Sequence, residues 1–210
     1  MSLQPRLIVD KNDRMKAFLN HALPQQGMTL VELVVVLAIA AIFLSYGVPS
    51  YQSVTAQDRM AGEINGLSGA IELTRSAAVK QGVPVTICAS ANPTANPPSC
   101  SGSSSWATGW IVFTDIANNR TYSTASGDTL FRVQAGLQGG DSLTGTAGSP
   151  GAFAGNLSAL TFNRMGGTAN FGGLSLHDGT NRLNWRRCLV VSLVGTTQLN
   201  TQVRNPGVCP

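Results

Sequence analysis

A run of 21 residues from Met28 to Val48 is almost entirely apolar, and it constrains the chain more than any other feature. Its single charged side chain is Glu32, the fifth residue of the run. As an α-helix, a segment of this length extends about 30 Å, which matches the hydrocarbon core of a bilayer. The run therefore predicts a membrane-spanning helix near the N-terminus, with one acidic residue close to its start.

The residues in front of this run differ from those of an ordinary secretory signal peptide. Such a peptide has a shorter apolar core followed by a cleavage site of small residues, whereas here the small residue, Gly27, precedes the core. Four cations also precede the run, which places the N-terminus in the cytoplasm. These are Arg6, Lys11, Arg14 and Lys16. Translation from Met1 and translation from Met15 both fit this arrangement, and the sequence leaves the start open.

Gly27, the offset to Glu32 and the uninterrupted apolar run resemble the class III signal of type IV pilins and type II secretion pseudopilins. The resemblance implies that a prepilin peptidase cleaves between Gly27 and Met28, and that the new N-terminal residue is N-methylated. It also implies that Glu32 pairs with the free α-amine of Met28, on a neighbouring subunit or on its own chain, during filament assembly. Pro49 matches the family's helix-kinking proline, and Gly47 adds to the expected kink. Met28 departs from the family, which usually has Phe there.

The helical pattern continues beyond the apolar run. Apolar residues recur at steps of three, four and seven, which defines one face of an amphipathic helix. They are Met60, Ile64, Leu67, Ile71 and Ala78. Gly82, followed by Val83 and Pro84, is typical of a helix end. The sequence thus predicts one helix of about fifty residues, the first half in the membrane and the second half packed on a globular domain.

Beyond Pro84 the pattern changes to short strands separated by turn signals, which is typical of paired β-sheets. The expected strands are residues 85–88, 110–115, 129–133, 160–163, 169–176, 188–194 and 198–203. Residues 188–194 are expected to be the central strand, and 136–155 a long flexible connection. Trp106, Trp110, Phe113 and Phe162 are expected in the core or packed against loops, and not as a platform for stacking bases. The predicted fold class is α+β, a long N-terminal helix packed on a C-terminal antiparallel β-sheet domain.

Four cysteines follow the apolar run: Cys88, Cys100, Cys188 and Cys209. None has the Cys-x-x-Cys spacing of a metal or redox site. In an oxidising compartment such as the periplasm, two disulfides are expected. Of the three possible connectivities we favour Cys88–Cys100 and Cys188–Cys209, because each closes a local loop.

No catalytic or metal-binding pattern is recognisable, so we expect a protein that is not an enzyme and that carries no cofactor and no metal. The two histidines, His21 and His177, lie far apart, and His177 with Asp178 is interpreted as a turn pair. The chain has no Gly-x-Ser-x-Gly elbow and no phosphate-binding glycine loop. Only 11% of residues are charged and 23 are glycine, which is typical of an exported β-rich domain.

The β-rich part narrows the resemblance to the GspH/FimT group of pilin-like proteins. Residues 67–88 are similar to its helix-to-first-strand signature, and residues 106–115 to its second-strand pattern, Trp-x-x-Gly-Trp-Ile-Val-Phe-x-Asp. Residues 160–166 and 189–195 complete a match that covers nearly the whole chain after Gly27.

This resemblance implies a minor type IV pilin, a structural subunit that primes or caps a pilus filament after leader cleavage and helix packing. The alternatives are a minor H-type pseudopilin of the type II secretion system and a DNA-binding pilin of natural transformation. The implied partners are the prepilin peptidase, other minor pilins or pseudopilins, the major pilin, the inner-membrane assembly platform and the membrane itself.

The expected organisation is a leader (1–27), a transmembrane and polymerisation half of the helix (28–53) and a periplasmic globular domain (54–210). The chain would cross the bacterial inner membrane once, with its N-terminus in the cytoplasm, and would then enter a pilus.

Four arginines near the C-terminus form the one candidate for nucleic-acid binding: Arg182, Arg186, Arg187 and Arg204. No acid follows Asp178, and a basic patch can contact phosphates. DNA-binding members of the group carry Gly-Arg-x-Arg after the last apolar strand, but residues 195–198 here read Gly-Thr-Thr-Gln. Nucleic acid is therefore a disfavoured partner, and we interpret the arginines as protecting a strand edge.

Overall fold

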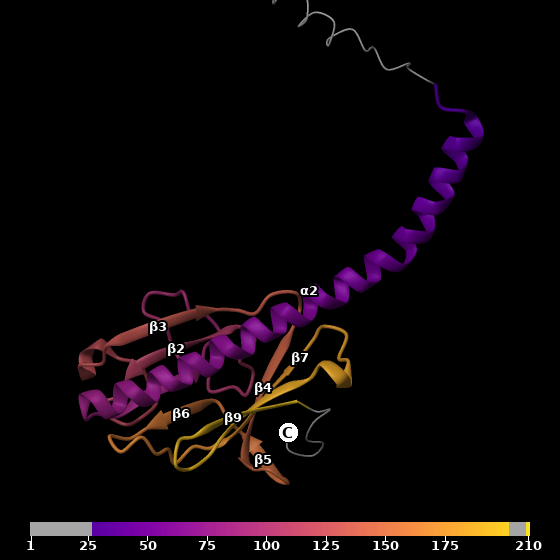
Figure 1. The fold of residues 1–210 in the computed structure, drawn as a ribbon. Helices are drawn as coiled ribbons and strands as arrows, with labels where there is room; N and C mark the ends of the chain where they lie inside the picture. The colour runs from indigo at the N-terminus through magenta and orange to yellow at the C-terminus, as the bar shows by residue number, and fades with distance from the viewer. Residues whose placement is uncertain (1–26, 202–208) are drawn as a thin grey trace, which may run out of the picture. The chain divides into compact units, whose positions relative to one another are not determined.

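The computed structural model describes residues 27–201 and 209–210 of the chain (Figure 1). The chain divides into two compact units between Pro49 and Ser50. One long helix, α2 (Leu30–Gln81), contributes to both units, and the described strands all belong to the second. The predicted leader before Gly27, and Arg204, lie outside the described residues.

Helix α2 is 52 residues long, as the periodicity predicted. It ends at Gln81 because Gly82 adopts a left-handed backbone with φ 71°, a conformation that glycine tolerates best. The N–H of Gly82 donates to the carbonyl of Ala78 at 3.0 Å. The predicted apolar face is confirmed, since each of its side chains is no more than 1% exposed; they are Met60, Ile64, Leu67, Ile71 and Ala78.

The strands form two antiparallel sheets. The first has the order β3-β2-β1-β6. Its strands are β1 (Val85–Ala89), β2 (Gly109–Thr114), β3 (Leu130–Ala135) and β6 (Ala159–Phe162). The second has the order β5-β4-β7-β8-β9. Its strands are β4 (Ser142–Ser149), β5 (Ala152–Asn156), β7 (Gly172–His177), β8 (Arg187–Val191) and β9 (Thr197–Thr201). Two short 3₁₀ helices, η1 (Thr124–Ser126) and η2 (Leu183–Trp185), lie in the connections.

One apolar core joins α2 to both sheets. The buried face of α2 shares this core with inward side chains of the first sheet, such as Ile87 and Leu160, and of the second, such as Leu174 and Leu189. In Figure 1 the part of α2 after Ser50 runs across the strands. The four aromatics that the sequence placed in the core or against loops are all buried: Trp106, Trp110, Phe113 and Phe162. The α+β fold class is therefore confirmed.

The opposite face of the first sheet is also covered. Cys88, Ile111, Phe113 and Ala159 form a second buried cluster, against which Tyr122 packs. The alternation of side chains along a strand explains this arrangement, since successive residues point to opposite faces. All residues of β1 and β2 are consequently buried, which fits their continuous apolar sequences.

The expected flexible connection at 136–155 is wrong, because most of it belongs to strands β4 and β5. Its glycines and small polar residues resembled a loop. Burial nevertheless alternates at the start of β4, where Leu143 and Gly145 are buried and Ser142 and Thr144 are exposed. A side chain at Gly145 would collide with the carbonyl of Leu157 and the indole of Trp106. The glycine therefore marks a close backbone approach within a strand rather than a turn.

The expected central strand at 188–194 also needs correction. Strand β8 ends at Val191, and the next residues form a turn in which the N–H of Gly195 donates to the carbonyl of Ser192 at 2.9 Å. The apolar residues Leu193 and Val194 lie in this turn and are exposed. The centre of the second sheet is β7, and β8 lies between it and the edge strand β9.

Both disulfides close the local loops that the sequence favoured. Cys88 in β1 is bonded to Cys100, and Cys188 in β8 is bonded to Cys209; both Cα–Cα distances are 5.6 Å. The second bond ties the end of the chain to the second sheet, where the Ser175 hydroxyl donates to the carbonyl of Pro210 at 3.2 Å.

Candidate functional site

The N-terminus of α2 is capped by its own sequence. Thr29 immediately precedes the helix, and its Oγ1 accepts a hydrogen bond from the backbone N–H of Glu32 at 3.2 Å. The carbonyl of Thr29 accepts the first helical bond, from the N–H of Leu33, also at 3.2 Å. The spacing Thr29-x-x-Glu32 is that of a capping box, and an acid in the first turn is favoured by the helix dipole. Glu32 therefore sits where helix physics favours an acid, quite apart from any filament.

The residues directly before α2 are exposed to solvent. Gly27 and Met28 are not helical and are exposed. A Cβ on Gly27 would meet no atom of the described residues within 4 Å, so packing within that part of the chain does not demand glycine there.

The apolar run at the start of α2 has no partner among the described residues. An 18-residue window in α2 has a mean hydropathy of 2.4, and none of it is buried, so length and composition permit the helix to cross a membrane. The large apolar side chains from Met28 to Val54 are all exposed, by 49% to 78%. They are Met28, Leu30, Val31, Leu33, Val34, Val35, Val36, Leu37, Ile39, Ile42, Phe43, Leu44, Tyr46, Val48, Tyr51 and Val54. A helix that is apolar on every side is typical of burial in lipid or among other helices.

Helix α2 continues through Gly47 and Pro49. Proline cannot donate a helical hydrogen bond and crowds the preceding turn. Hydroxyls on either side bond to the backbone: Ser45 to the carbonyl of Ile42 at 2.7 Å and Ser53 to that of Ser50 at 2.8 Å. The expected kink at these residues stays a prediction.

Polar side chains tie the second half of α2 to the loops between strands. Arg75 donates from Nε to the carbonyl of Gly166 at 3.0 Å and from Nη2 to that of Val194 at 3.4 Å. Glu72 accepts from the Thr197 hydroxyl at 2.6 Å. Arg75 thus holds the turns after β6 and after β8, which gives a structural reason for its place in the helix signature.

A second polar contact lies near the start of the packed half of the helix. Arg59 binds the buried carboxylate of Asp141 with two hydrogen bonds, of 2.8 and 2.9 Å. The hydrogen bond to Asp141 raises the pKa of Arg59. One turn along, Glu63 accepts from the N–H of Gln138 at 3.0 Å, while its other oxygen is buried without a hydrogen-bond partner in the described chain. Burial raises the pKa of Glu63.

Asp115, the residue directly after β2, organises the turn that follows. Asp115 is fully buried and accepts hydrogen bonds from the Thr86 hydroxyl at 2.8 Å and from the backbone N–H groups of Asn119 and Arg120, each at 2.9 Å. The pattern that ends in Asp115 therefore has a structural purpose, because this carboxylate replaces the backbone partners that a tight turn cannot supply.

Two family models match the chain, one over its helix-and-strand part and one over the segment that contains Gly27 and Glu32. A model described as "Type II transport protein GspH" matches residues 63–195. The chain belongs to the GspH family. A second model, the prokaryotic N-terminal methylation motif, matches residues 23–46 and so includes Gly27, Met28 and Glu32. The pilin-like resemblance is thereby confirmed, while cleavage between Gly27 and Met28 and methylation of Met28 stay predictions. No curated protein sequence matches the chain.

Comparison with solved structures finds proteins similar to this GspH-family chain. The type IV minor pilin FimU of Pseudomonas aeruginosa is 16% identical, with a TM-score of 0.52, over 76% of this chain and 99% of FimU. The minor pseudopilin EpsH of the Vibrio cholerae type 2 secretion system is 13% identical, with a TM-score of 0.43, over 66% of this chain and 95% of EpsH. At this level of identity the likeness to FimU concerns the fold alone.

The C-terminal arginines of the GspH-family chain engage their own loop. The guanidinium of Arg182 stacks on Trp185, 4.2 Å from the ring centre, and Arg186 donates to Asn181 at 3.0 Å. Arg187 begins β8. Asn181 also lies 2.9 Å from His177 Nδ1, and burial lowers the pKa of His177.

Asp178 supports the interpretation of His177 and Asp178 as a turn pair. Its carboxylate accepts from the N–H of Arg182 at 2.7 Å and from the hydroxyl of Thr180. Burial acts to raise the pKa of Asp178, but these hydrogen bonds outweigh it and the pKa is lowered. In the described residues, no group of three or more His, Cys, Asp or Glu side chains could hold a metal ion.

Sequence reasoning missed two features of this chain. The capping role of Thr29 was readable from its three-residue spacing to Glu32. The second feature is a hollow beside Arg120, whose walls come from segments far apart in the sequence. No local pattern could have revealed those walls.

Proposed function

We propose that this GspH-family chain is a minor type IV pilin that enters a filament through the apolar half of α2 after cleavage between Gly27 and Met28. The observation that carries the proposal is the apolar stretch, exposed on all sides, that begins with a capped turn containing Glu32. Lipid alone would satisfy such a surface but would leave the Glu32 carboxylate without a charged partner. Packing against other helices gives one, since polar pairs stabilise helix contacts inside membranes.

The proposed roles of individual residues follow from that packing. Gly27 and Met28 are exposed and outside the helix, as a peptidase substrate must be. Cleavage would place a free and then methylated α-amine on Met28, four residues before the Glu32 carboxylate. That carboxylate would pair with an α-amine, on a neighbouring subunit or on its own chain. The subunit would then prime or cap the filament, and FimU, a minor pilin of the same fold, supports this choice.

The test must separate pairing from capping, because Glu32 lies where either would be useful. Glu32→Gln keeps a residue that a capping box accepts but removes the charge. Thr29→Val removes the cap and keeps the charge. Asp58→Ala is the matched control, since Asp58 is an exposed acid on the same helix outside the apolar run.

The full-length variants are expressed in a strain deleted for this chain, and sheared filaments are immunoblotted for the subunit and for the major pilin. We expect Glu32→Ala and Glu32→Gln to be processed but absent from filaments, and Asp58→Ala to be incorporated normally. Gly27→Glu should stay at precursor size. Normal incorporation of Glu32→Gln would reject the charge pairing and leave capping as the role of Glu32.

A second candidate function is a minor pseudopilin of type II secretion, which the match to the family of the type II transport protein GspH favours. The same deletion strain separates the two. Loss of surface pili, restored by the wild-type chain, supports the pilin. Normal pili with loss of secreted proteins from the medium supports the pseudopilin.

A further inference from the structure

Three adjoining hollows in the second unit share Arg120 as a lining residue, and together they form what we call the Arg120 depression. Their volumes are about 200, 300 and 320 Å³. The outer side of β6 is covered at its end, because Phe162 and Thr168 form an antiparallel bridge there. The chain that follows this bridge supplies Asn170, which lines the first and third hollows. The depression is therefore walled by segments on both sides of β6.

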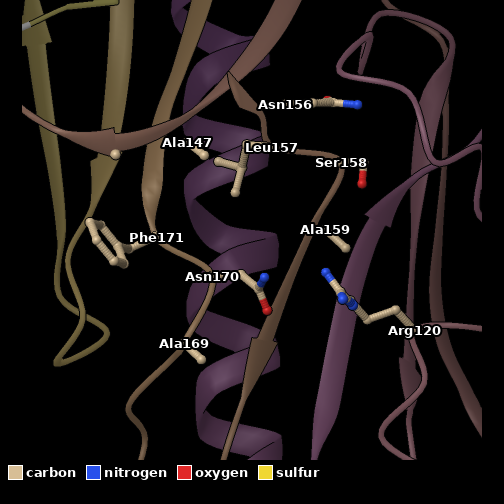
Figure 2. Close-up of a pocket in the computed structure, with 10 residues that line it drawn as sticks. Arg120, Ala147, Asn156, Leu157, Ser158, Ala159, Ala169, Asn170 and Phe171 are labelled. Carbon is tan, nitrogen blue, oxygen red and sulfur yellow. The ribbon is translucent and has the colours of Figure 1, made fainter. Parts of the chain in front are cut away.

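Three polar side chains face the first hollow without a partner in the chain. Figure 2 shows Arg120 and Asn170 extending toward each other across it, with the Ser158 hydroxyl turned toward the same space. None of these three side chains makes a hydrogen bond or an ion pair with a described residue. A few convergent polar groups in a hollow are typical of a small-molecule site.

The backbone of Arg120 adopts a conformation that arginine rarely has. Its φ of 58° lies in the left-handed region, which costs glycine less. Its N–H is held by the buried carboxylate of Asp115 at 2.9 Å. Asn118, in the same turn, also has a positive φ, of 51°, and lines the third hollow. A charged side chain kept at such a position points to a binding role.

The charge of the depression selects the class of ligand. Arg120 is the only charged residue among those that line the three hollows, and most of the other polar ones carry amides or hydroxyls. A guanidinium pairs with a carboxylate through two parallel hydrogen bonds. Phosphate sites commonly add a helix N-terminus or further cations, and the described lining residues supply neither. One carboxylate therefore matches the depression better than a phosphate.

The uncharged part of the lining favours a sugar as the carrier of that carboxylate. Sugar hydroxyls donate and accept hydrogen bonds, as the side chains of Asn170 and Ser158 do. Phe171 and Ala159 offer apolar surface to the C–H face of a sugar ring. The first hollow, of about 200 Å³, is smaller than the roughly 300–1,000 Å³ of sites for drug-sized ligands, so it suits a single sugar unit.

An extended peptide fits the depression less well. A peptide that adds to a sheet needs a free strand edge. Strand β6 pairs with β1 on one side, and the bridge between Phe162 and Thr168 lies on the other. Recognition at the depression must therefore rely on side chains, which suits a sugar.

The wall around the second hollow is braced. Gly102 lines this hollow, and its carbonyl accepts a hydrogen bond from Asn156 Nδ2 at 3.0 Å. Cys100, in the same wall, is bonded to Cys88, the register partner of Ala159. The wall is therefore fixed before anything binds, which lowers the ordering cost of binding.

We propose that the Arg120 depression binds an acidic sugar unit, with the sugar carboxylate paired to Arg120 and sugar hydroxyls bonded to Asn170 and Ser158. Arg120 selects the charged sugar, and the amide and hydroxyl groups orient the ring. The apolar half of α2 takes no part in this site, so the proposal does not depend on filament entry.

The test uses the methyl glycosides of glucuronic acid, galacturonic acid and N-acetylneuraminic acid, each beside a neutral glycoside with a hydroxymethyl group in place of the carboxylate. Binding to the full-length protein in detergent is followed by NMR, from the amide signals of Arg120 and Asn170. We expect at least one acidic glycoside to bind with a dissociation constant of about 10 mM or lower. Its neutral partner should bind about tenfold more weakly, since a hydrogen bond to a charged group contributes roughly this much. Acetate and inorganic phosphate should also bind more weakly than that glycoside.

Variants separate recognition from folding. In Arg120→Gly the relief of backbone strain offsets the greater freedom of the unfolded chain, so the midpoint of thermal unfolding should change little while the preference for the acidic glycoside is lost. Asn170→Ala keeps the backbone bonds to Thr168 and should weaken binding of the glycoside but not of acetate. Arg164→Ala is the matched control, since Arg164 is an exposed arginine that lines none of the three hollows, and it should bind as the wild type does.

Four results would overturn the proposal. The first is that none of the three acidic glycosides binds below about 10 mM. The second is equal binding of the acidic and neutral glycosides. The third is binding of acetate or phosphate as tight as that of the acidic glycoside, which would make the depression a general anion site. The fourth is an equal loss of binding in Arg164→Ala and Arg120→Gly.

Discussion

Two stretches of helix α2 differ in whether their apolar side chains are buried. In the first stretch of α2, up to Pro49, the large apolar side chains are exposed, and the only charge is Glu32. In the later stretch, from Met60 to Ala78, one face is buried, and the other carries charged residues such as Glu72. Both stretches are regular helix, so backbone propensity does not distinguish them. The distribution of apolar residues around the helix does.

The difference shows what each stretch requires. The later stretch is satisfied within its own chain, because two sheets cover its apolar face and polar contacts at Arg59 and Arg75 fix its position. The first stretch is not satisfied within the described chain, and burial of its apolar surface must come from lipid or other helices. Folding thus buries the apolar face of the later stretch, and the apolar surface of the first stretch would be buried only on assembly with lipid or other helices.

The largest expected effect is on the free energy of unfolding, to which a leucine of the later stretch should contribute far more than a leucine of the first stretch. Leu67 is fully buried and Leu37 is 59% exposed. Leu67→Ala should lower the free energy of unfolding by about 2–5 kcal/mol, because it removes buried methyl groups and leaves a cavity. Leu37→Ala should change it by no more than about 0.5 kcal/mol. The measurement is urea unfolding of the full-length protein in detergent, followed by tryptophan fluorescence. Equal effects at the two leucines would break the comparison.

The disulfides provide the next effect, and both lie in the second unit. Their partners are 12 and 21 residues apart, so each should stabilise that unit by about 3 kcal/mol, the longer loop slightly more. Replacing Cys88 and Cys100, or Cys188 and Cys209, by alanine should lower the free energy of unfolding accordingly. Neither change should release the chain from membranes, which carbonate extraction would report. Loss of membrane association in either variant would contradict the independence of the two stretches.

Arg59 and Asp58 are neighbours on α2 with different surroundings. The Asp141 side chain is fully buried, and Arg59 is its ionic partner. Arg59→Met should lower the free energy of unfolding by about 1–3 kcal/mol, because it leaves that carboxylate buried and uncompensated. Arg59→Lys keeps the charge and should cost less. Asp58→Ala, at an exposed position, should change stability by less than about 0.5 kcal/mol. Thermal unfolding of the three variants would show whether burial rather than charge decides.

Much of the fold could be predicted because the strongest signals are local. The length of α2, its buried face and its end at Gly82 follow from periodicity and one glycine. The strand sequences of β1 and β2 are continuous apolar runs. Strand β4 was missed because Gly145 is needed where Leu157 and Trp106 approach the backbone, and such an approach is a property of tertiary structure.

The functional residues also divide into those that local sequence identifies and those that only the tertiary structure brings together. Gly27, Met28 and Glu32 lie within one short segment, so the sequence alone singled them out. The depression beside β6 combines Arg120, Ala159 and Asn170, which come together only when the two sheets are formed. The exposed turn at Leu193 was mistaken for strand because its apolar residues continue the pattern of β8.

The smallest expected effect concerns pH and tests how tightly the later stretch of α2 is packed. Burial raises the pKa of Glu63 above its ordinary value of 4.5, and Asp141 and Arg59 are its charged neighbours. The folded chain then holds a proton that the unfolded chain releases, in a window that starts near pH 4.5. Stability from Glu63 is complete below that window and is lost as the pH rises through the raised pKa.

Glu63→Gln should remove this slope. The amide oxygen can still accept from Gln138, and its N–H groups can donate to Asp141, so stability at pH 7 should equal that of the wild type or exceed it by less than about 1 kcal/mol. The measurement is the midpoint of thermal unfolding between pH 4 and pH 7 for both proteins. Asp178 has a lowered pKa and contributes the opposite slope in both, so it cancels in the difference. Parallel curves would mean that Glu63 is solvated in solution, and that the later stretch of α2 is looser than its contacts indicate.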